Sequence, residues 1–281
     1  MTLPFQTRFV ALAAERSPLC VGIDPSRESL AEWGVADDVE GLRLFCRRLV
    51  AAAAPLVATV KPQVAFFERL GPAGMEILRE TVAEARAHGT LVILDAKRGG
   101  IASTATAYGE AFLGPDSAFG GDAITVSAYL GYGSLSPILD IARAAAAGVF
   151  IVVRSSNPEG GDVQRARLPD GRTVAEHLAE RITADNATVA ENGLGPIGAV
   201  VGATLGDETI GLVERLSNAL MLVPGIGAQG ATIVDVRANF GRHARRVIPS
   251  ISRGISRAGP DPDALRRRVK QYVVETRGLS A

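Results

Sequence analysis

The stretch Thr90-Leu-Val-Ile-Leu-Asp-Ala-Lys-Arg-Gly-Gly-Ile101 joins an apolar run to an acid and a base that stand two residues apart. Residues i and i+2 of a strand point to the same side. Asp95 and Lys97 are therefore predicted to project together from the end of one strand. Such a pair can set negative charge against a substrate beside a proton donor. A surface ion pair that closes the strand would explain the same residues.

Seven more short apolar runs of strand type occur along the chain, and helical patterns separate them. Apolar strands that alternate with amphipathic helices indicate a parallel sheet covered by helices on its outside. The pattern predicts an α/β fold, most simply a single (β/α)8 TIM barrel domain over residues 1–281, with an open doubly wound sheet as the competitor. The eight runs are residues 19–23, 56–60, 90–94, 123–126, 149–153, 197–201, 219–223 and 247–251, and the main helical patterns are residues 39–54, 75–87, 135–147, 174–191 and 263–275.

Two segments lie outside this alternation. Phe5 to Ala14 predicts an additional N-terminal helix, of the kind that could plug the bottom of a barrel. Ser155 to Gly171 is rich in Gly, Pro, Arg and Asp, and is expected to be one long loop between a strand and a helix rather than a domain boundary.

Composition narrows the function classes. The 281 residues are 47% hydrophobic and 21% charged, and 30 basic residues balance 30 acidic ones, so no overall field favours nucleic acid or an anionic membrane. No apolar run reaches membrane-spanning length, and the first residues lack the shape of a signal peptide, so we expect a cytoplasmic protein. Cys20 and Cys46 are interpreted as buried free thiols of a reducing compartment, and the three histidines form no metal-ligand spacing.

Candidate functional residues gather where the predicted strands end, which is where the active groups of such barrels collect. Each has a simpler explanation by itself, such as a turn at Asp24-Pro25 or a helix cap at Ser127. Their coincidence favours a site. They are Asp24, Lys61, Asp95, Lys97, Ser127, the run from Arg154 to Ser156, Pro224-Gly225 and Arg253.

The segment from Pro224 to Gly230 contains a formal G-x-G-x-x-G after a strand, which is a dinucleotide-binding signature. It lies at the seventh strand instead of the first, and no acid ends the following strand, so we discount that interpretation. We expect backbone N–H groups at Gly227, the side chain of Gln229 and the charge of Arg253 to bind a phosphate. A glycine-rich turn beside a structural arginine is the alternative.

Five segments together resemble orotidine 5′-phosphate decarboxylase in its longer bacterial form, and the match runs in order from Val21 to about Gly259. The segments are Asp95-Ala-Lys97 with Ile101 downstream, Lys61-Pro-Gln-Val-Ala-Phe-Phe-Glu68, Ser156-Asn-Pro-Glu-Gly160, Val223-Pro-Gly-Ile-Gly-Ala-Gln-Gly230 and Ser252-Arg253.

The resemblance implies decarboxylation of orotidine 5′-phosphate to UMP and carbon dioxide in pyrimidine biosynthesis, with no cofactor and no metal. It implies that Lys97 donates a proton to the pyrimidine C6 and that Asp95 faces the substrate carboxylate. It also implies a homodimer with shared active sites. The binding residues would be Asp24 and Lys61 for the ribose hydroxyls, Ser156 for the pyrimidine edge, Gly227, Gln229 and Arg253 for the 5′-phosphate, and Thr104 for a neighbouring subunit's site.

One position departs from the pattern of the family, which reads Asp-x-Lys-x-x-Asp-Ile. Gly100 stands where the second aspartate belongs. In the family this carboxylate crosses the dimer interface, touches the ribose and completes an alternating chain of lysines and aspartates. We therefore expect the fold and the binding of the ligand to be retained better than the rate of turnover.

Two other functions stay open. A protein that binds UMP or orotidine 5′-phosphate and has lost turnover through Gly100 is the first. A metal-dependent phosphosugar enzyme of related barrel architecture is the second, and the Ser156-Asn-Pro-Glu-Gly160 segment counts against it.

Overall fold

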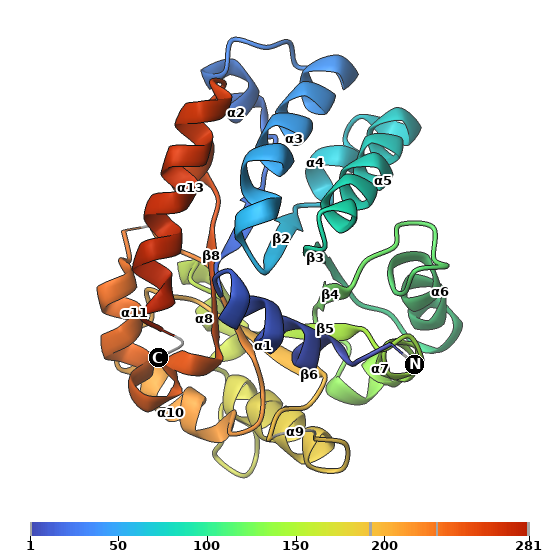
Figure 1. The fold of residues 1–281 in the computed structure, drawn as a ribbon. Helices are drawn as coiled ribbons and strands as arrows, with labels where there is room; N and C mark the ends of the chain where they lie inside the picture. The colour runs from blue at the N-terminus through green and yellow to red at the C-terminus, as the bar shows by residue number, and fades with distance from the viewer. Residues whose placement is uncertain (1, 191–192, 229, 280–281) are drawn as a thin grey trace.

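The computed structural model describes residues 2–190, 193–228 and 230–279. Within them, eight strands alternate with helices from one end of the chain to the other (Figure 1). The strands are β1 (Cys20–Ile23), β2 (Thr59–Pro62), β3 (Leu91–Arg98), β4 (Ala123–Val126), β5 (Gly148–Arg154), β6 (Ile197–Val201), β7 (Met221–Val223) and β8 (Val247–Ile251).

Each strand pairs in parallel with the next, and β8 pairs in parallel with β1, so the sheet closes into a barrel. The closing ladder matches Cys20 with Ser250 and Val21 with Ile251. A closed parallel sheet has no free edge, and its strand ends meet on one rim. The predicted (β/α)8 barrel is confirmed, and the open doubly wound sheet is wrong.

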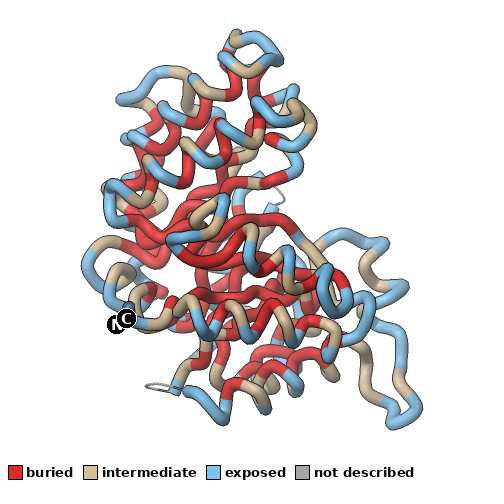
Figure 2. Tube along the Cα trace, turned by 90° about the vertical axis from the view of Figure 1, so that its right-hand side faces the viewer, coloured by how far each residue is buried: buried red, intermediate tan, exposed pale blue. Residues whose placement is uncertain are grey.

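Side chains alternate between the inside of the barrel and the layer of helices, as the pleat of a strand requires. Ile248 belongs to the inner cluster of buried residues, whereas Val247 and Ile251 belong to the outer one. Figure 2 shows the buried residues running through the centre of the molecule, with exposed residues on the outer helices and loops. The apolar strand runs therefore have both faces buried.

The predicted N-terminal helix is present as α1 (Phe5–Glu15), and it covers the bottom of the barrel. Phe5 and Phe9 belong to the inner cluster, and the ring of Phe5 meets Phe150 of β5 edge to face with centroids 5.7 Å apart. Arg8 holds the helix in place through an ion pair of 2.6 Å to Asp122, which precedes β4.

The other helices form the outer layer of the barrel or short turns in the loops. They are α2 (Arg27–Glu32), α3 (Val39–Ala53), α4 (Ala65–Glu68), α5 (Gly71–Ala87), α6 (Ala102–Phe112), α7 (Ser136–Ala144), α8 (Gly161–Gln164), α9 (Val174–Ala187), α10 (Glu208–Arg215), α11 (Ile233–Phe240), α12 (Arg253–Ser256) and α13 (Pro262–Arg277), with 3₁₀ turns η1 (Ala54–Leu56), η2 (Tyr132–Leu135), η3 (Pro158–Gly160) and η4 (Gly241–Arg246).

Several predicted boundaries were wrong. The second strand begins at Thr59 instead of Leu56, because residues 54–56 form η1 around Pro55, and Lys61 therefore lies inside β2 instead of after it. The third strand runs on to Arg98 and includes Asp95 and Lys97. Helix α9 ends at Ala187, and residue 191, the predicted end, lies outside the described residues.

The segment between β5 and α9 is one long loop that contains only η3 and α8, as predicted. Over the described residues, the helices are all too short or too polar to cross a membrane.

Candidate active site

Asp95 lies at the centre of a cluster of charged side chains on the rim where the strands end. Its Oδ2 atom is 2.7 Å from the Nζ of Lys61 on β2, and its Oδ1 atom is 2.6 Å from the Nζ of Lys97. The side chains of Lys61 and Asp95 are each 8% exposed, whereas that of Lys97 is 49% exposed. One lysine is therefore a buried partner of the carboxylate, and the other is open to a ligand.

The backbone of Lys97 explains how this geometry arises, and it differs from the expected regular strand. Lys97 has a φ of +46°, and the ladder between β3 and β4 shifts register between Leu94 and Arg98. A left-handed backbone costs a residue with a side chain about 1 to 3 kcal/mol, and such strain is typical of functional sites. The two side chains meet as predicted, but through a local break in the strand.

Thr125 of β4 supports this break and was missed by sequence reasoning. Its hydroxyl donates to Asp95 Oδ1 at 2.8 Å and accepts from the backbone N–H of Lys97 at 3.0 Å. Gln63 was missed as well, and its Oε1 lies 3.4 Å from the Nζ of Lys97. The sequence could have indicated Thr125 through its inward-facing position on a neighbouring strand. The break in β3 that brings the Lys97 backbone to Thr125 has no signal in the sequence.

The charges in the cluster stabilise one another. Burial by itself raises the pKa of Asp95, but the positive charges of Lys61 and then Lys97 outweigh it, so the pKa is held well below its ordinary range. Burial lowers the pKa of Lys61, and the charges of Asp95 and Asp24 more than offset it, so the pKa is raised above its ordinary value. Asp95 and Lys61 therefore both stay charged at neutral pH.

Asp24 follows β1, and its negative charge acts on Lys61 of the same cluster. Its Oδ1 atom is buried and has no hydrogen-bond partner among the described residues. A buried acceptor without a partner is costly, so this oxygen is suited to receive a hydrogen bond from a ligand.

The loops after β5 and β8 pack directly over neighbouring strands at two glycines. A Cβ built on Gly202 would lie 2.9 Å from the backbone nitrogen of Ser156, and one built on Gly22 would lie 2.7 Å from Cβ of Ser252. Any larger residue at either glycine would displace these loops. Ser156 and Arg253, which follows Ser252, are therefore held close over the barrel.

The expected phosphate-binding residues lie on two adjoining segments. Gly227 has a φ of +82°, and a Cβ built on it would lie 3.9 Å from Cα of Gly254, the neighbour of Arg253. Arg253 is half-buried and forms no ion pair with a described carboxylate. The N–H of Gly227 donates to the carbonyl of Ala231 at 2.8 Å, which is a partner that the sequence did not predict. Gln229 lies outside the described residues.

The loop after β3 carries the position that departs from the motif. Gly100 has no left-handed φ, and a Cβ built on it would lie 3.2 Å from Cγ2 of Thr104 and 3.3 Å from the backbone nitrogen of Ala105. Thr104 is exposed on α6, so it does not join the cluster around Asp95 within this chain.

The residues present also bear on metal binding. Within residues 2–190, 193–228 and 230–279, no three side chains of His, Cys, Asp or Glu are grouped so that they could hold a metal ion. The rim of the closed barrel carries a cluster of charged side chains made of Lys61, Asp95 and Lys97. A closed (β/α)8 barrel with charged side chains grouped on the rim at its strand ends is the arrangement of (β/α)8 barrel enzymes.

Comparison with known proteins specifies this class. The model of the "Orotidine 5'-phosphate decarboxylase / HUMPS family" matches residues 17–268. Orotidine 5′-phosphate decarboxylase of Streptomyces coelicolor is 52% identical over 274 residues, covering 98% of this chain and 97% of that one, and the enzyme of Myxococcus xanthus is 49% identical over 278 residues, covering 99% and 96%. A crystal structure of a Streptomyces avermitilis protein, described as a candidate orotidine 5′-phosphate decarboxylase, has a TM-score of 0.94 to this chain at 50% identity. The match covers 99% of this chain and 96% of that one.

The chain belongs to the orotidine 5′-phosphate decarboxylase / HUMPS family.

Proposed function

We propose that this protein converts orotidine 5′-phosphate to UMP and carbon dioxide in pyrimidine biosynthesis, as the relatives' names indicate. The observation that carries the proposal is the contact of Asp95 with Lys61 and Lys97, at 2.7 Å and 2.6 Å, on the rim of the barrel. Family and fold give the class of chemistry, and this cluster supplies the charges that the reaction needs.

Lys97 is the proton donor in this proposal. When the bond between C6 and the carboxylate breaks, its electron pair stays at C6, and the neighbouring ammonium both stabilises that charge and delivers a proton to the carbon. Asp95 keeps its negative charge because its pKa is lowered, and it faces the substrate carboxylate. Lys61 pairs with Asp95 from the buried side, and Lys97, which pairs with the other carboxylate oxygen, is exposed and faces the substrate in this proposal.

The sugar and the base are assigned to residues around this centre. Asp24 and Lys61 bind the ribose hydroxyls, which is supported by the buried, unpartnered Oδ1 of Asp24. Ser156 reads the edge of the pyrimidine from the loop after β5, where it packs on Gly202.

Arg253, Gln229 and the backbone at Gly227 bind the 5′-phosphate. The half-buried Arg253 without a carboxylate partner in the described chain supports this assignment, because a guanidinium with no internal partner can pair with a phosphate. The hydrogen bond from Gly227 to Ala231 has to open, or a neighbouring N–H has to serve instead. Binding energy gained at the phosphate positions the base for the reaction.

Gly100 lowers the rate in this proposal. The aspartate that the family pattern has at this position would give Lys97 a second acidic neighbour, and its absence leaves the ammonium held by Asp95 and Gln63 alone among the described side chains. The second candidate function, a nucleotide-binding protein that has lost turnover, rests on the same residue.

We also propose a cytoplasmic homodimer with shared active sites. Ile101, Tyr129 and Leu130 are 62%, 81% and 57% exposed, and they lie on the loops after β3 and β4, which are joined by a hydrogen bond from Ser127 N–H to Arg98. Exposed apolar side chains beside a site are typical of an interface. Thr104, which is exposed near the start of α6, reaches the partner's site in this proposal. The two cysteines are buried and free, as is typical of proteins in a reducing compartment such as the cytoplasm.

The test is to incubate the purified protein with orotidine 5′-phosphate and follow the loss of its ultraviolet absorbance, with and without a chelator. Turnover that the chelator does not change supports the proposal. Tight binding of UMP without turnover would select the binding protein, and turnover of a phosphosugar that requires Mg²⁺ would select the metal-dependent enzyme.

A further inference from the structure

We infer that Gln164 is a positioning residue for the substrate base, because its side-chain amide fixes the turn that carries Ser156. This inference rests on the function proposed above and adds a residue to it. Gln164 ends α8 inside the long loop, nine residues after Ser155, and it does not itself touch the proposed site.

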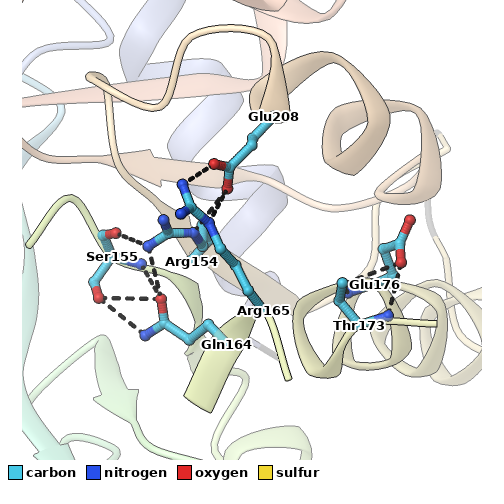
Figure 3. A network of polar contacts seen from close by, with 7 residues as sticks. All are labelled: Arg154, Ser155, Gln164, Arg165, Thr173, Glu176 and Glu208. Atoms are coloured by element: carbon cyan, nitrogen blue, oxygen red, sulfur yellow. Dashed lines mark hydrogen bonds and ion pairs between the residues drawn. The ribbon is translucent and has the colours of Figure 1, made fainter. Parts of the chain in front are cut away.

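The amide of Gln164 uses both of its ends on the same turn, as Figure 3 shows. Its Oε1 atom accepts from the backbone N–H of Ser155 at 3.0 Å, and its Nε2 atom donates to the hydroxyl of Ser155 at 2.9 Å. The contacts fix both the backbone and the side chain of the residue directly before Ser156. They add to the packing of Gly202 on Ser156, so the orientation of Ser156 is set in part by the turn that Gln164 fixes.

The buried Arg154 connects the contact between Gln164 and Ser155, called the clasp below, to the barrel. Its Nη1 atom donates to Oε1 of Gln164 at 3.2 Å and to the carbonyl of Ser155 at 2.6 Å, and its Nε atom donates to Glu208 of α10 at 3.1 Å. Arg165, the neighbour of Gln164, pairs with the same carboxylate of Glu208. Arg154 and Arg165, on either side of this contact, are therefore both connected to α10. Oε1 of Gln164 accepts from both Arg154 and Ser155, so it joins the turn to this network.

Packing leaves the clasp little freedom. A Cβ built on Gly160 would lie 2.6 Å from the hydroxyl of Ser155 and 3.0 Å from Oε1 of Gln164, although Gly160 has an ordinary helical backbone. On the other side, Gly202 packs on Ser156 and donates its N–H to the carbonyl of Arg154 at 2.8 Å. The far end of the loop is fixed separately by the capping box of Thr173 and Glu176 at the start of α9 (Figure 3).

The experiment compares Gln164→Leu, which removes both polar atoms, with Gln164→Glu, which keeps an acceptor for Ser155 and Arg154. Gly160→Ala disturbs the clasp without changing Gln164, and its backbone accepts alanine. Gln271→Leu is the matched control, because Gln271 accepts from Arg268 at 3.2 Å on the exposed face of α13, in a glutamine–arginine contact away from the site. The measurements are KM and kcat for orotidine 5′-phosphate, and the affinities for UMP and for ribose 5-phosphate, which lacks the base.

We expect Gln164→Leu and Gly160→Ala to raise KM and to weaken the binding of UMP about tenfold, with kcat nearly unchanged. This is the effect of losing roughly one hydrogen bond. Ribose 5-phosphate should bind all four variants like the wild type, and Gln164→Glu and Gln271→Leu should stay within about threefold of it. Equal losses for UMP and ribose 5-phosphate, or no loss for either, would overturn the inference. If the wild type neither turns over orotidine 5′-phosphate nor binds UMP, the proposed function fails, and the inference fails with it. If the wild type does both and the variants lack the base-specific loss, the inference alone fails.

Discussion

The ammonium nitrogen of Lys97 lies 2.6 Å from Oδ1 of Asp95, and the backbone of Lys97 adopts a φ of +46° in making this contact. The strain is maintained by the hydroxyl of Thr125, which binds both the carboxylate and the backbone N–H of Lys97. The position of the proposed proton donor therefore depends on a neighbouring strand as well as on its own.

Replacing Thr125 by valine should reduce kcat for orotidine 5′-phosphate by about thirtyfold, because two hydrogen bonds of about 1 kcal/mol each are lost and the shape of the side chain is kept. Affinity for UMP should change less. Thr59→Val is a suitable control, since the hydroxyl of Thr59 is buried in the same barrel but has no hydrogen-bond partner among the described residues. Equal kcat in the two variants would show that Thr125 does not position Lys97.

Replacing Arg253 by alanine should weaken UMP and leave uridine nearly unchanged. The loss of a charge-assisted contact to phosphate is about 1.5 to 3 kcal/mol. Calorimetric titration of both ligands measures the difference, and the exposed Arg266, on α13, provides a control arginine. Equal losses for UMP and uridine would refute the assignment of Arg253.

Replacing Gly100 by aspartate should raise turnover by at least about tenfold, which corresponds to roughly 1.4 kcal/mol of barrier. The gain should appear mainly in kcat, because a better-held proton donor acts in the transition state. Thr104 has to give way by a few tenths of an ångström to admit the new side chain. Gly100→Asn adds the same bulk without the charge, and it should not produce the gain. An unchanged rate for Gly100→Asp in a folded, UMP-binding dimer would mean that this loop is not the family's catalytic loop.

The proposed homodimer predicts that sedimentation gives twice the mass of one chain. Glutamate at both Tyr129 and Leu130 should shift the protein toward monomers, because it places charge in an apolar interface. The same pair of changes at the exposed apolar residues Val234 and Val274 provides a control. A wild-type monomer that binds UMP at full stoichiometry would contradict the shared site.

The lowered pKa of Asp95 predicts how stability depends on pH. A carboxyl group with a folded-state pKa below its unfolded value stabilises the fold fully above the unfolded value, near 4, and loses this contribution as the pH falls through the folded value. Asp95→Asn should therefore be destabilised relative to the wild type near neutral pH, and the difference should shrink as the pH falls below about 4. Urea unfolding across this range measures it, and a difference that does not depend on pH would show that Asp95 is not stabilised as a charged group.

The sequence predicted the barrel because its strands are buried on both faces, so runs such as Ala123 to Val126 are apolar throughout and lie between helical patterns. It predicted the contact of Asp95 with Lys97 because residues i and i+2 at the end of one strand point to the same side. The second strand was misplaced because Pro55 ends α3 in a 3₁₀ turn, and local apolar character does not distinguish that turn from a strand.

The parts of the site that could not be predicted depend on contacts between distant segments. Gln164 carries no signal of its own, because its partners Arg154 and Ser155 lie nine or more residues away at the end of β5. The contact of Thr125 with the Lys97 backbone depends on the local break in β3. The left-handed backbone of Lys97 was also hidden, since lysine has no preference for it.

The most direct test of the account follows orotidine 5′-phosphate labelled in its carboxylate carbon by NMR, with the wild type and with Lys97→Ala. The account predicts that the wild type releases the label as carbon dioxide and bicarbonate in an amount equal to the UMP formed. It predicts that Lys97→Ala binds UMP and releases no measurable label. Persistence of the labelled substrate with a folded, UMP-binding wild type, or release by Lys97→Ala at the wild-type rate, would contradict it.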